Sequence, residues 1–407
     1  MADPNMTSSP AETWAVFVES NTTGNGEELI AKAREHGLTP LLITSNAARY
    51  LFHEKVRTIV TNTLDADHVL AVVRSSLPKG SVALVTSTAD RHLQVAASVA
   101  ASLGLRGPDP EAIARCRDKG VQRQVLAGTG VSVPEFFVVT RPDEAERAAE
   151  ILGSSVVVKP VNGTGSVGVR WCATPAHARE HTAALLTDSF DQRGEPRAAR
   201  VLIEKAVWGR EFSVEILAGA VVGVSETHLG ELPTFVEIGH DHPATLDRRD
   251  FVAVVKEAVA ALYALGLDHQ DAHVELRLDD APTVIEVNPR LPGGFITTLV
   301  KLATGVDMLD AHLCQLTGAG VDLTPTLHQA AAIRWDLTTR VTSYDPAGGS
   351  DPHIILDGTG TESTVKSPFG DFRDRKNYAI GTGYSPIVAA NRAEQALIRH
   401  SLEKLHP

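Results

Sequence analysis

The chain has few cysteines and no long apolar run. Cys116, Cys172 and Cys314 are the only cysteines among 407 residues, and no two of them form a CxxC pair. This pattern argues against a disulfide framework or a zinc ribbon and predicts three buried or inert thiols. Neither a stretch of about 18 apolar residues nor a secretory leader is present, so we expect a cytoplasmic protein without a membrane span.

Basic residues are outnumbered by acidic ones. The 38 Lys and Arg against 50 Asp and Glu give a formal net charge of −12. Such a balance disfavours nucleic acid or an anionic membrane as the main partner. Several catalytic motifs are also missing. The sequence has no GxxxxGK(S/T) phosphate loop, no HExxH metal motif and no GxSxG elbow, and we therefore set aside those three chemistries.

What is present is an ordinary globular composition, 43% hydrophobic and 22% charged. The length exceeds the roughly 250–300 residues at which a single core stops growing, which predicts two or more domains. After a flexible tail at 1–12, strand-like and helix-like segments alternate to about residue 103, which predicts a parallel α/β sheet. From residue 134, short β-branched strands in hairpin-like pairs predict an α+β architecture. A further unit is expected from about residue 326.

A glycine-rich stretch lies in the segment 156–171, VVVKPVNGTGSVGVRW, with the pattern GxGxxG at 163–168. The dinucleotide fingerprint of that spacing requires a helix directly after the glycines, whereas residues 167–172 have the pattern of a strand. We expect a strand–turn–strand flap whose backbone N–H groups and Ser166 hydroxyl approach phosphate oxygens, with Lys159 adding an ammonium group. An ordinary glycine hairpin with a surface lysine is the alternative.

Two acidic residues face each other in the segment 273–294, HVELRLDDAPTVIEVNPRLPGG, which predicts two strands joined by a tight turn. Symmetric pairing places Glu275 opposite Glu286 and His273 opposite Asn288. Opposed carboxylates repel, and a sheet tolerates them when a cation lies between them. Carboxylate and amide oxygens are ligands suited to Mg²⁺ or Mn²⁺. Two exposed glutamates on a solvated sheet face are the alternative interpretation.

These segments, in this order, resemble the ATP-grasp ligases over about residues 118–320. The resemblance implies an ATP-grasp fold that combines α/β and α+β parts. It also implies four domains. An α/β domain spans 13–117, a small lobe with the flap spans 118–208, a large lobe with the metal site spans 209–325, and a carboxy-terminal subdomain spans 326–407.

The same resemblance implies that the enzyme binds ATP with Mg²⁺ or Mn²⁺, as two ions. The implied ATP contacts are two phosphate-binding lysines, the flap, an adenine hinge at 201–207 and a ribose-binding carboxylate: Lys119, Lys159, Gly165, Ser166, Glu204, Lys205, Val207 and Glu211. The implied metal ligands are Glu275, Glu286 and Asn288. Arg290, beside the reacting phosphate, and Lys159 are the implied catalytic residues.

A closer likeness is to the L-amino acid ligase branch, which makes dipeptides and related amides, including natural products. It rests on ESNTTGNG at 19–26, EIGHDHPATL at 237–246 and VNPRLPGG at 287–294. By this resemblance, ATP phosphorylates a carboxylate to an acyl phosphate, and an amine then displaces phosphate to form an amide. The candidate substrate contacts are Arg290, Gly293, Gly294, His240 and His273.

Some alternatives stay open at this point. His240 and His242 lie in a polar segment expected to be a loop, where a histidine either borders the substrate or faces solvent. An ATP-grasp carboxylase or nucleotide-precursor ligase, using bicarbonate or a purine intermediate, is a second function. A non-catalytic nucleotide-binding protein is a third, against which the metal ligands and both lysines argue. The expected partners are small-molecule carboxylates and amines, with a homodimer left open.

Overall fold

The computed structural model of the protein describes residues 12–22, 25–188, 190, 196–337, 354–357, 375 and 377–405. The tail expected at 1–12 lies, apart from its last residue, outside the described residues. The chain forms two compact units. Unit 1 comprises Met1–Ile113 with Leu309–Asp322, and unit 2 comprises Ala114–Met308 with Leu323–Pro407. In the described part of the chain, no helix has the length and apolar character that a bilayer crossing requires.

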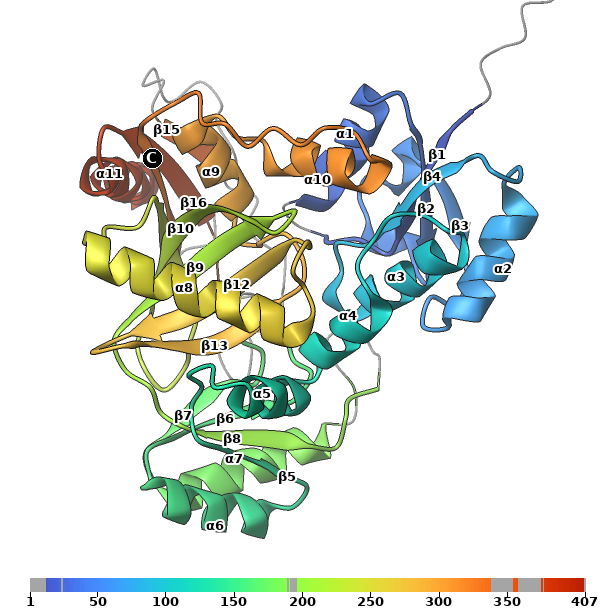
Figure 1. Cartoon of the computed structure of the whole chain (residues 1–407). Coiled ribbons are helices and arrows are strands. Elements are labelled where there is room, and N and C mark those ends of the chain that lie inside the picture. Colours follow the sequence, from blue (N-terminus) through green and yellow to red (C-terminus); the bar gives the residue numbers. More distant parts are fainter. Residues whose placement is uncertain are drawn as a thin grey trace, which may run out of the picture. The chain divides into compact units, whose positions relative to one another are not determined.

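Unit 1 contains a sheet of four parallel strands in the order β3-β2-β1-β4 (Figure 1). The strands are β1 (Trp14–Val18), β2 (Thr39–Thr44), β3 (Arg57–Val60) and β4 (Val82–Thr86). Strand β1 is apolar along its whole length and buried at every position, as expected of a parallel strand covered on both faces. The parallel α/β sheet predicted for this part of the chain is confirmed.

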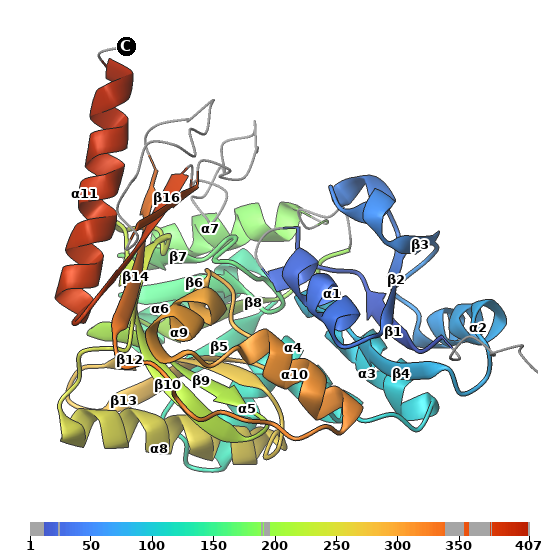
Figure 2. The same ribbon diagram turned by 90° about the horizontal axis from the view of Figure 1, so that it is seen from above.

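The helices of unit 1 include one that comes much later in the sequence. They are α1 (Asn25–Glu35), α2 (Ala66–Ser76), α3 (Leu93–Ser102) and α10 (Met308–Thr317), with the short 3-10 helices η1 (Ala47–Arg49), η2 (His53–Lys55) and η3 (Asp90–His92). Helix α4 (Pro110–Arg117) runs from unit 1 into unit 2. Helix α10 lies beside α1 in both views (Figures 1 and 2). Helix α10 therefore belongs to unit 1, although the rest of that unit comes from the amino-terminal part of the chain.

The smaller sheet of unit 2 is antiparallel, with the order β5-β8-β6-β7. Its strands are β5 (Phe136–Val139), β6 (Val156–Pro160), β7 (Arg170–Cys172) and β8 (Val201–Lys205), and its helices are α5 (Lys119–Gly128), α6 (Pro142–Leu152) and α7 (Pro175–Thr187). Helices α6 and α7 pack together below this sheet in Figure 1 and share an apolar core with it. Gly153, with a φ of 93°, ends α6 in the left-handed conformation that glycine adopts at helix ends.

The larger sheet of unit 2 has eight antiparallel strands in the order β13-β12-β9-β10-β11-β14-β16-β15. Its strands are β9 (Arg210–Leu217), β10 (Ala220–Leu229), β11 (Glu237–His242), β12 (Ala272–Leu278), β13 (Pro282–Asn288), β14 (Ala330–Asp336), β15 (Ile354–Asp357) and β16 (Asn377–Gly383). Helix α8 (Arg248–Leu265) packs on β12 and β13, α9 (Ile296–Thr304) packs on β11 and β14, and α11 (Pro386–Leu405) runs along β14 and β16 (Figure 2).

The carboxy-terminal segment from residue 326, expected to form a unit of its own, supplies β14, β15 and β16. These strands continue the eight-stranded sheet beyond β11. The predicted α+β architecture after the first domain is confirmed, since both sheets of unit 2 are antiparallel and covered by helices.

Candidate active site

The opposed carboxylates lie where the sequence places them. Strands β12 and β13 pair with Glu275 opposite Glu286 and His273 opposite Asn288. The two glutamate side chains keep 25% and 19% of their surface exposed, so each can be reached by a small ion. Neither is simply solvated, because Asn288 Nδ2 donates to Glu275 Oε1 at 3.2 Å and Glu286 has a cationic partner. The predicted opposition of these residues is therefore confirmed, although a register shift between Glu275 and Leu276 makes the pairs nearer the turn, such as Leu278 with Pro282, differ from the symmetric pairing.

That cationic partner is Lys119, the first residue of α5. Its Nζ lies 2.9 Å from Glu286 Oε1 and donates to the Gly163 carbonyl at 2.6 Å. Its backbone N–H donates to the Val161 carbonyl at 2.7 Å. The side chain of Asp118 begins the helix by accepting two backbone N–H bonds. Lys119 therefore connects the start of α5, the glycine loop and the carboxylate pair.

His273 lies between Glu275 and a fully buried carboxylate, Glu215 on β9. Its Nδ1 lies 2.9 Å from Glu215 Oε2, and its Nε2 lies 3.3 Å from Glu275 Oε1. Burial alone would lower the pKa of His273, but the two carboxylates outweigh burial and raise the pKa to about 10. The imidazolium is thus a fixed cation that positions Glu275. Sequence reasoning missed Glu215, whose only signal is an acidic residue inside the apolar strand REFSVEIL.

Three buried charges form a second group behind the glycine loop. Glu204 on β8 lies 2.5 Å from Lys159 Nζ on β6 and 2.5 Å from Arg123 Nε on α5. Burial alone would raise the pKa of Glu204, but Arg123 and Lys159 outweigh it and lower the pKa. Arg123 also donates to the Ile285 carbonyl on β13. Lys159 is only 4% exposed, so the alternative of a surface lysine is wrong.

Arg123 was not among the predicted site residues, although it lies one helical turn after Lys119 and on the same side of α5. Lys205, the neighbour of Glu204 in the predicted hinge, behaves differently. It is exposed, and its Nζ lies 3.0 Å from Glu135 Oε1. The alternation along β8 therefore turns the Glu204 carboxylate into the interior and the Lys205 ammonium toward solvent.

A third group joins Glu211 on β9 to Arg277 on β12, which are register partners. The Arg277 guanidinium lies 2.9 Å from Glu211 Oε2 and also donates to the Val207 carbonyl at 2.9 Å. Burial raises the pKa of Glu211 to about 7, with Glu275 and Glu237 adding to the rise and Arg277 opposing it. The predicted ribose-binding carboxylate, Glu211, and the predicted adenine-lining residue, Val207, are therefore held by one arginine.

The glycine loop connects β6 and β7, which pair as an antiparallel hairpin, so no helix follows the glycines. The predicted strand–turn–strand arrangement is confirmed, although its second strand begins only at Arg170 rather than at residue 167. Gly165 is exposed, and both Gly165 and Ser166 adopt positive φ, at 61° and 59°. At the far end of the loop, the His181 ring contacts the Gly168 carbonyl at 2.9 Å. The loop is thus anchored at both ends.

The segment after β13 carries Arg290, Gly293 and Gly294. Arg290 is half-buried, and its Nη1 donates to the Leu291 carbonyl at 2.9 Å. Gly294 has a φ of 59°, and a Cβ there would lie 2.6 Å from Nε2 of His240. Only a residue without a side chain fits against that ring.

His240 and His242 do not lie in a solvent-exposed loop as one interpretation of the sequence held. Both are buried in β11, at 2% and 1% exposed. His240 Nε2 is 3.5 Å from Glu237 Oε2, at the outer limit of a hydrogen bond, and its ring lies edge-on to Trp335 at 5.1 Å between centroids. Burial lowers the pKa of His242 to about 4. The polar sequence EIGHDH forms an interior strand, which pairs with β10 on one side and with β14 on the other. Its burial could not be predicted locally, because β14 lies about ninety residues further along the chain.

A further ion pair beside His240 was also missed. Arg375 pairs with Glu237, donates to the Glu237 carbonyl at 3.1 Å, and places its guanidinium 4.2 Å above the Trp335 ring. Burial alone would raise the pKa of Glu237, but Arg375 and His240 outweigh it and lower the pKa. No local pattern marks this contact, because the partners are 138 residues apart.

Comparison with known proteins agrees with this architecture. A family model described as an ATP-grasp domain matches residues 152–299. Over 395 residues the chain is 30% identical to y4rH, an uncharacterized protein of Sinorhizobium fredii, covering 96% of this chain and 82% of that protein. It is 29% identical over 200 residues to carnosine synthase 1 of Gallus gallus, covering 47% of this chain and 21% of the synthase.

The crystal structure of an L-amino acid ligase from Bacillus licheniformis has the same fold. Its TM-score with this chain is 0.72 at 21% sequence identity, with 97% of this chain and 98% of that chain covered. The ATP-grasp fold expected from the sequence is thereby confirmed.

Proposed function

We propose that this chain, which belongs to the ATP-grasp superfamily of ATP-dependent ligases, joins the carboxylate of an amino acid to an amine and releases ADP and phosphate. The observation that carries the proposal is the in-register pair Glu275 and Glu286, with Lys119 linking it to the glycine loop. The likeness to an L-amino acid ligase and to carnosine synthase supports an amide-forming reaction.

The carboxylate pair fits the divalent ions with which ATP-grasp enzymes bind ATP. Glu275, Glu286 and Asn288 would hold Mg²⁺ or Mn²⁺, as two ions, since hard oxygen donors from two facing strands converge there. Such ions supply charge neutralisation on the phosphates of ATP. His273 and Lys119 already balance the two carboxylates, so the pair is stable without relying on an ion to separate its charges.

The nucleotide would lie along the glycine loop and the β8 hinge. In this proposal the backbone of Gly165 and the Ser166 hydroxyl contact phosphate, while Lys119 and Lys159 contribute charge. The Glu204 carboxylate is bonded to Lys159 and Arg123, which supports a role in positioning Lys159 in addition to its implied place beside adenine. Val207 would line the adenine and Lys205 would flank it, and the Glu211 carboxylate would accept hydrogen bonds from the ribose hydroxyls.

The reaction needs activation of a poor electrophile rather than a protein nucleophile. A carboxylate oxygen takes the γ-phosphoryl group and ADP leaves, and the amine nitrogen then attacks the acyl carbon. The carbon–oxygen bond to phosphate breaks, and the nitrogen loses a proton to give the amide. Positioning and stabilisation of charge dominate such phosphoryl transfers. Arg290 is placed in this proposal beside the transferring phosphoryl group, and Lys159 assists from the nucleotide side.

The substrate would be bordered by Arg290, Gly293, Gly294 and His240. Support comes from the way Gly294 leaves room for the His240 ring, next to the ion pair of Glu237 and Arg375. A free amino acid carries one ammonium group and one carboxylate group. Glu237 carries the charge opposite to the ammonium, and Arg375 carries the charge opposite to the carboxylate. His273, a further substrate candidate, is bonded to two carboxylates, which favours its positioning role.

A substrate panel tests the proposal. ADP release should require one amino acid as carboxylate donor and rise further when an amine acceptor is added, whereas bicarbonate in place of the amino acid should give none. Glu286→Gln keeps the shape of the side chain and should lower turnover by at least roughly a hundredfold. The matched variant Glu150→Gln, at an exposed position of α6, should leave turnover unchanged. Turnover that depends on bicarbonate and not on an amino acid would favour the carboxylase alternative.

A further inference from the structure

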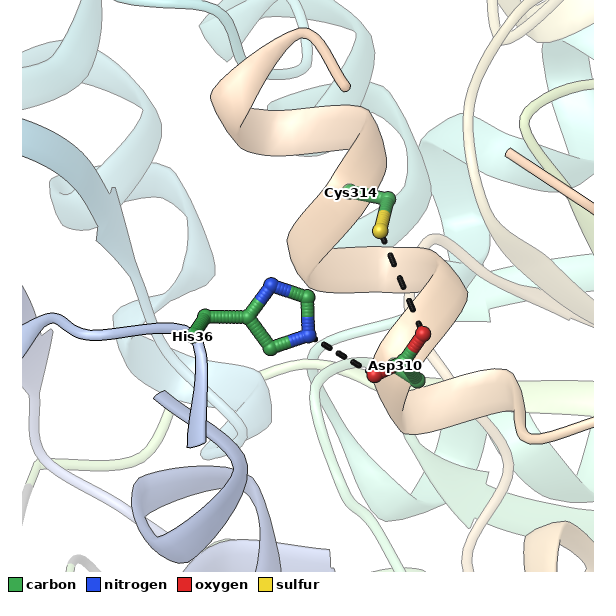
Figure 3. A group of neighbouring side chains, drawn as sticks. All are labelled: His36, Asp310 and Cys314. Atoms are coloured by element: carbon green, nitrogen blue, oxygen red, sulfur yellow. Dashed lines mark hydrogen bonds and ion pairs between the residues drawn. The ribbon is translucent and has the colours of Figure 1, made fainter. Parts of the chain in front are cut away.

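Three side chains of unit 1 that take no part in the proposed reaction lie together with metal-binding donor atoms. His36 directly follows the end of α1, and Asp310 and Cys314 lie on α10 (Figure 3). The imidazole nitrogen, the carboxylate oxygen and the sulfur all lie within 4.8 Å of one another. The sequence offers no clue to this grouping, because His36 and Asp310 are 274 residues apart.

The three side chains point toward a common centre. His36 Nε2 lies 2.7 Å from Asp310 Oδ1, and Cys314 Sγ lies 3.9 Å from Asp310 Oδ2. Asp310 and Cys314 are four residues apart on one helix, so they share a face of α10. The side chains of His36 and Asp310 are 25% and 45% exposed, which leaves a path for an ion to enter from solvent.

The donor set selects the kind of ion. Imidazole, carboxylate and thiolate together are typical ligands of Zn²⁺, which accepts nitrogen, oxygen and sulfur in a tetrahedral arrangement. A sulfur donor disfavours Mg²⁺ and Ca²⁺, which prefer oxygen alone. With Zn–N and Zn–O bonds of about 2.0 Å and a Zn–S bond of about 2.3 Å, bound donor atoms lie roughly 3.3–3.6 Å apart.

The two separations that involve Asp310, one to each of its carboxylate oxygens, differ from that range by less than an ångström. The His36–Asp310 contact of 2.7 Å would lengthen and the Cys314–Asp310 contact of 3.9 Å would shorten. Both changes need only rotations of partly exposed side chains. Three protein ligands would leave a fourth position for water.

We propose that His36, Asp310 and Cys314 form a zinc-type site that fastens the end of α1 to α10. On binding, the Cys314 thiol gives its proton to solvent and its sulfur bonds to the metal. This site is separate from the proposed Mg²⁺ ligands, which offer oxygen and no sulfur. The expectation of buried thiols holds for Cys116 and Cys172, which are buried, whereas Cys314 is half-buried and has donor neighbours.

Cobalt titration of the full chain, without an affinity tag and freed of metals by a chelator, tests the proposal. Co²⁺ bonded to a thiolate gives a sulfur-to-cobalt charge-transfer absorption, which a site built only from oxygen donors cannot give. One equivalent of Co²⁺ should produce this absorption, and Zn²⁺ should displace it. Cys314→Ser should abolish it, and His36→Ala should weaken Co²⁺ affinity by at least roughly tenfold.

Two control variants separate this site from the rest of the molecule. Cys172→Ala removes a buried thiol and should keep the absorption. Glu286→Gln should also keep it, so the result does not depend on the proposed ligase function. Circular dichroism of Cys314→Ser checks that the variant is folded. Absence of the absorption in the wild type, or its persistence in folded Cys314→Ser, would show that His36 and Asp310 form only a hydrogen-bonded pair.

Discussion

At the scale of single residues, Glu204 is the point where three buried charges of unit 2 meet. Its carboxylate is shared by Arg123 and Lys159, and all three side chains are almost fully buried. Each charge is costly to bury alone, and the group is tolerated because every member is paired. The same residue connects α5, β6 and β8, which carry the proposed nucleotide contacts.

Replacing Glu204 by Gln should therefore destabilise the protein strongly. The change leaves Arg123 and Lys159 facing each other without a counter-charge, and we expect the free energy of unfolding to fall by about 3–5 kcal/mol. Urea denaturation measures it. Glu135→Gln is the matched control, since Glu135 pairs with Lys205 on the surface and such pairs contribute about 1 kcal/mol or less. Equal losses in the two variants would contradict this account of Glu204.

Unit 1 also contains a buried carboxylate with several hydrogen-bond partners, that of Glu19. It lies at the end of β1, is fully buried, and accepts bonds from the Tyr50, Thr44 and Thr63 hydroxyls and from the Ser45 backbone N–H. Burial alone would raise the pKa of Glu19, but these donors outweigh it and lower the pKa from 4.5 to about 2. Its stabilising effect is therefore fully present above pH 4.5 and is lost as the pH falls toward 2.

Tyr50→Phe should expose this dependence. Losing the 2.5 Å bond from the Tyr50 hydroxyl to Glu19 should lower the free energy of unfolding at pH 7 by about 1–3 kcal/mol. The difference from the wild type should shrink as the pH falls from 4.5 to 2, because Glu19 becomes protonated. Unfolding curves at several pH values measure it, with Tyr384→Phe, at an 86% exposed position, as the control. A difference that stays constant with pH would argue against an ionised Glu19.

At the scale of elements, the glycine loop between β6 and β7 is fixed to the rest of unit 2 at its two ends. Lys119 holds one end through the Val161 and Gly163 carbonyls, and His181 holds the other through Gly168. Between them, Gly165 is exposed. Glycine loses more conformational freedom on ordering than other residues, so phosphate contacts would have to supply the ordering force.

Hydrogen exchange tests this property of the loop. Amide exchange at 162–169 should slow when a non-hydrolysable ATP analogue is added with Mg²⁺, since the loop would close over the phosphates. Exchange in α6, at Pro142–Leu152, should stay the same, which provides an internal control. Unchanged exchange in the loop at saturating nucleotide would contradict its assignment as a phosphate-binding flap.

The elements also show why some of the site could be predicted and some could not. The opposition of Glu275 and Glu286 arises between two adjacent strands joined by a short turn, so it can be predicted locally, whereas the register shift between Glu275 and Leu276 leaves no pattern in the sequence. The flap can be derived as well, because residues after the glycines lack a helix pattern. Burial of His240 depends on β14, and the partners of Glu237 and Glu215 lie 138 and 58 residues away. Such long-range pairings leave no local pattern.

At the scale of the whole molecule, all the proposed nucleotide, metal and substrate residues belong to unit 2, whereas the proposed zinc-type site belongs to unit 1. The strands β14 to β16 contribute to the same sheet as the metal ligands, although they follow them by more than forty residues. The proposed ATP chemistry therefore depends on residues of unit 2 that are spread from 119 to 294.

The central claim is that ATP is cleaved at its γ-phosphate to activate a carboxylate. Lys119, Lys159, Arg290 and the carboxylate pair are the groups proposed around the terminal phosphate. The β8 hinge offers little positive charge for an α-phosphate besides Lys205, which is exposed and pairs with Glu135. Chromatography of the nucleotides formed during turnover with the accepted amino acid tests this most directly. The account predicts ADP and phosphate, together with a hydroxamate when hydroxylamine replaces the amine. AMP and pyrophosphate as products would contradict it.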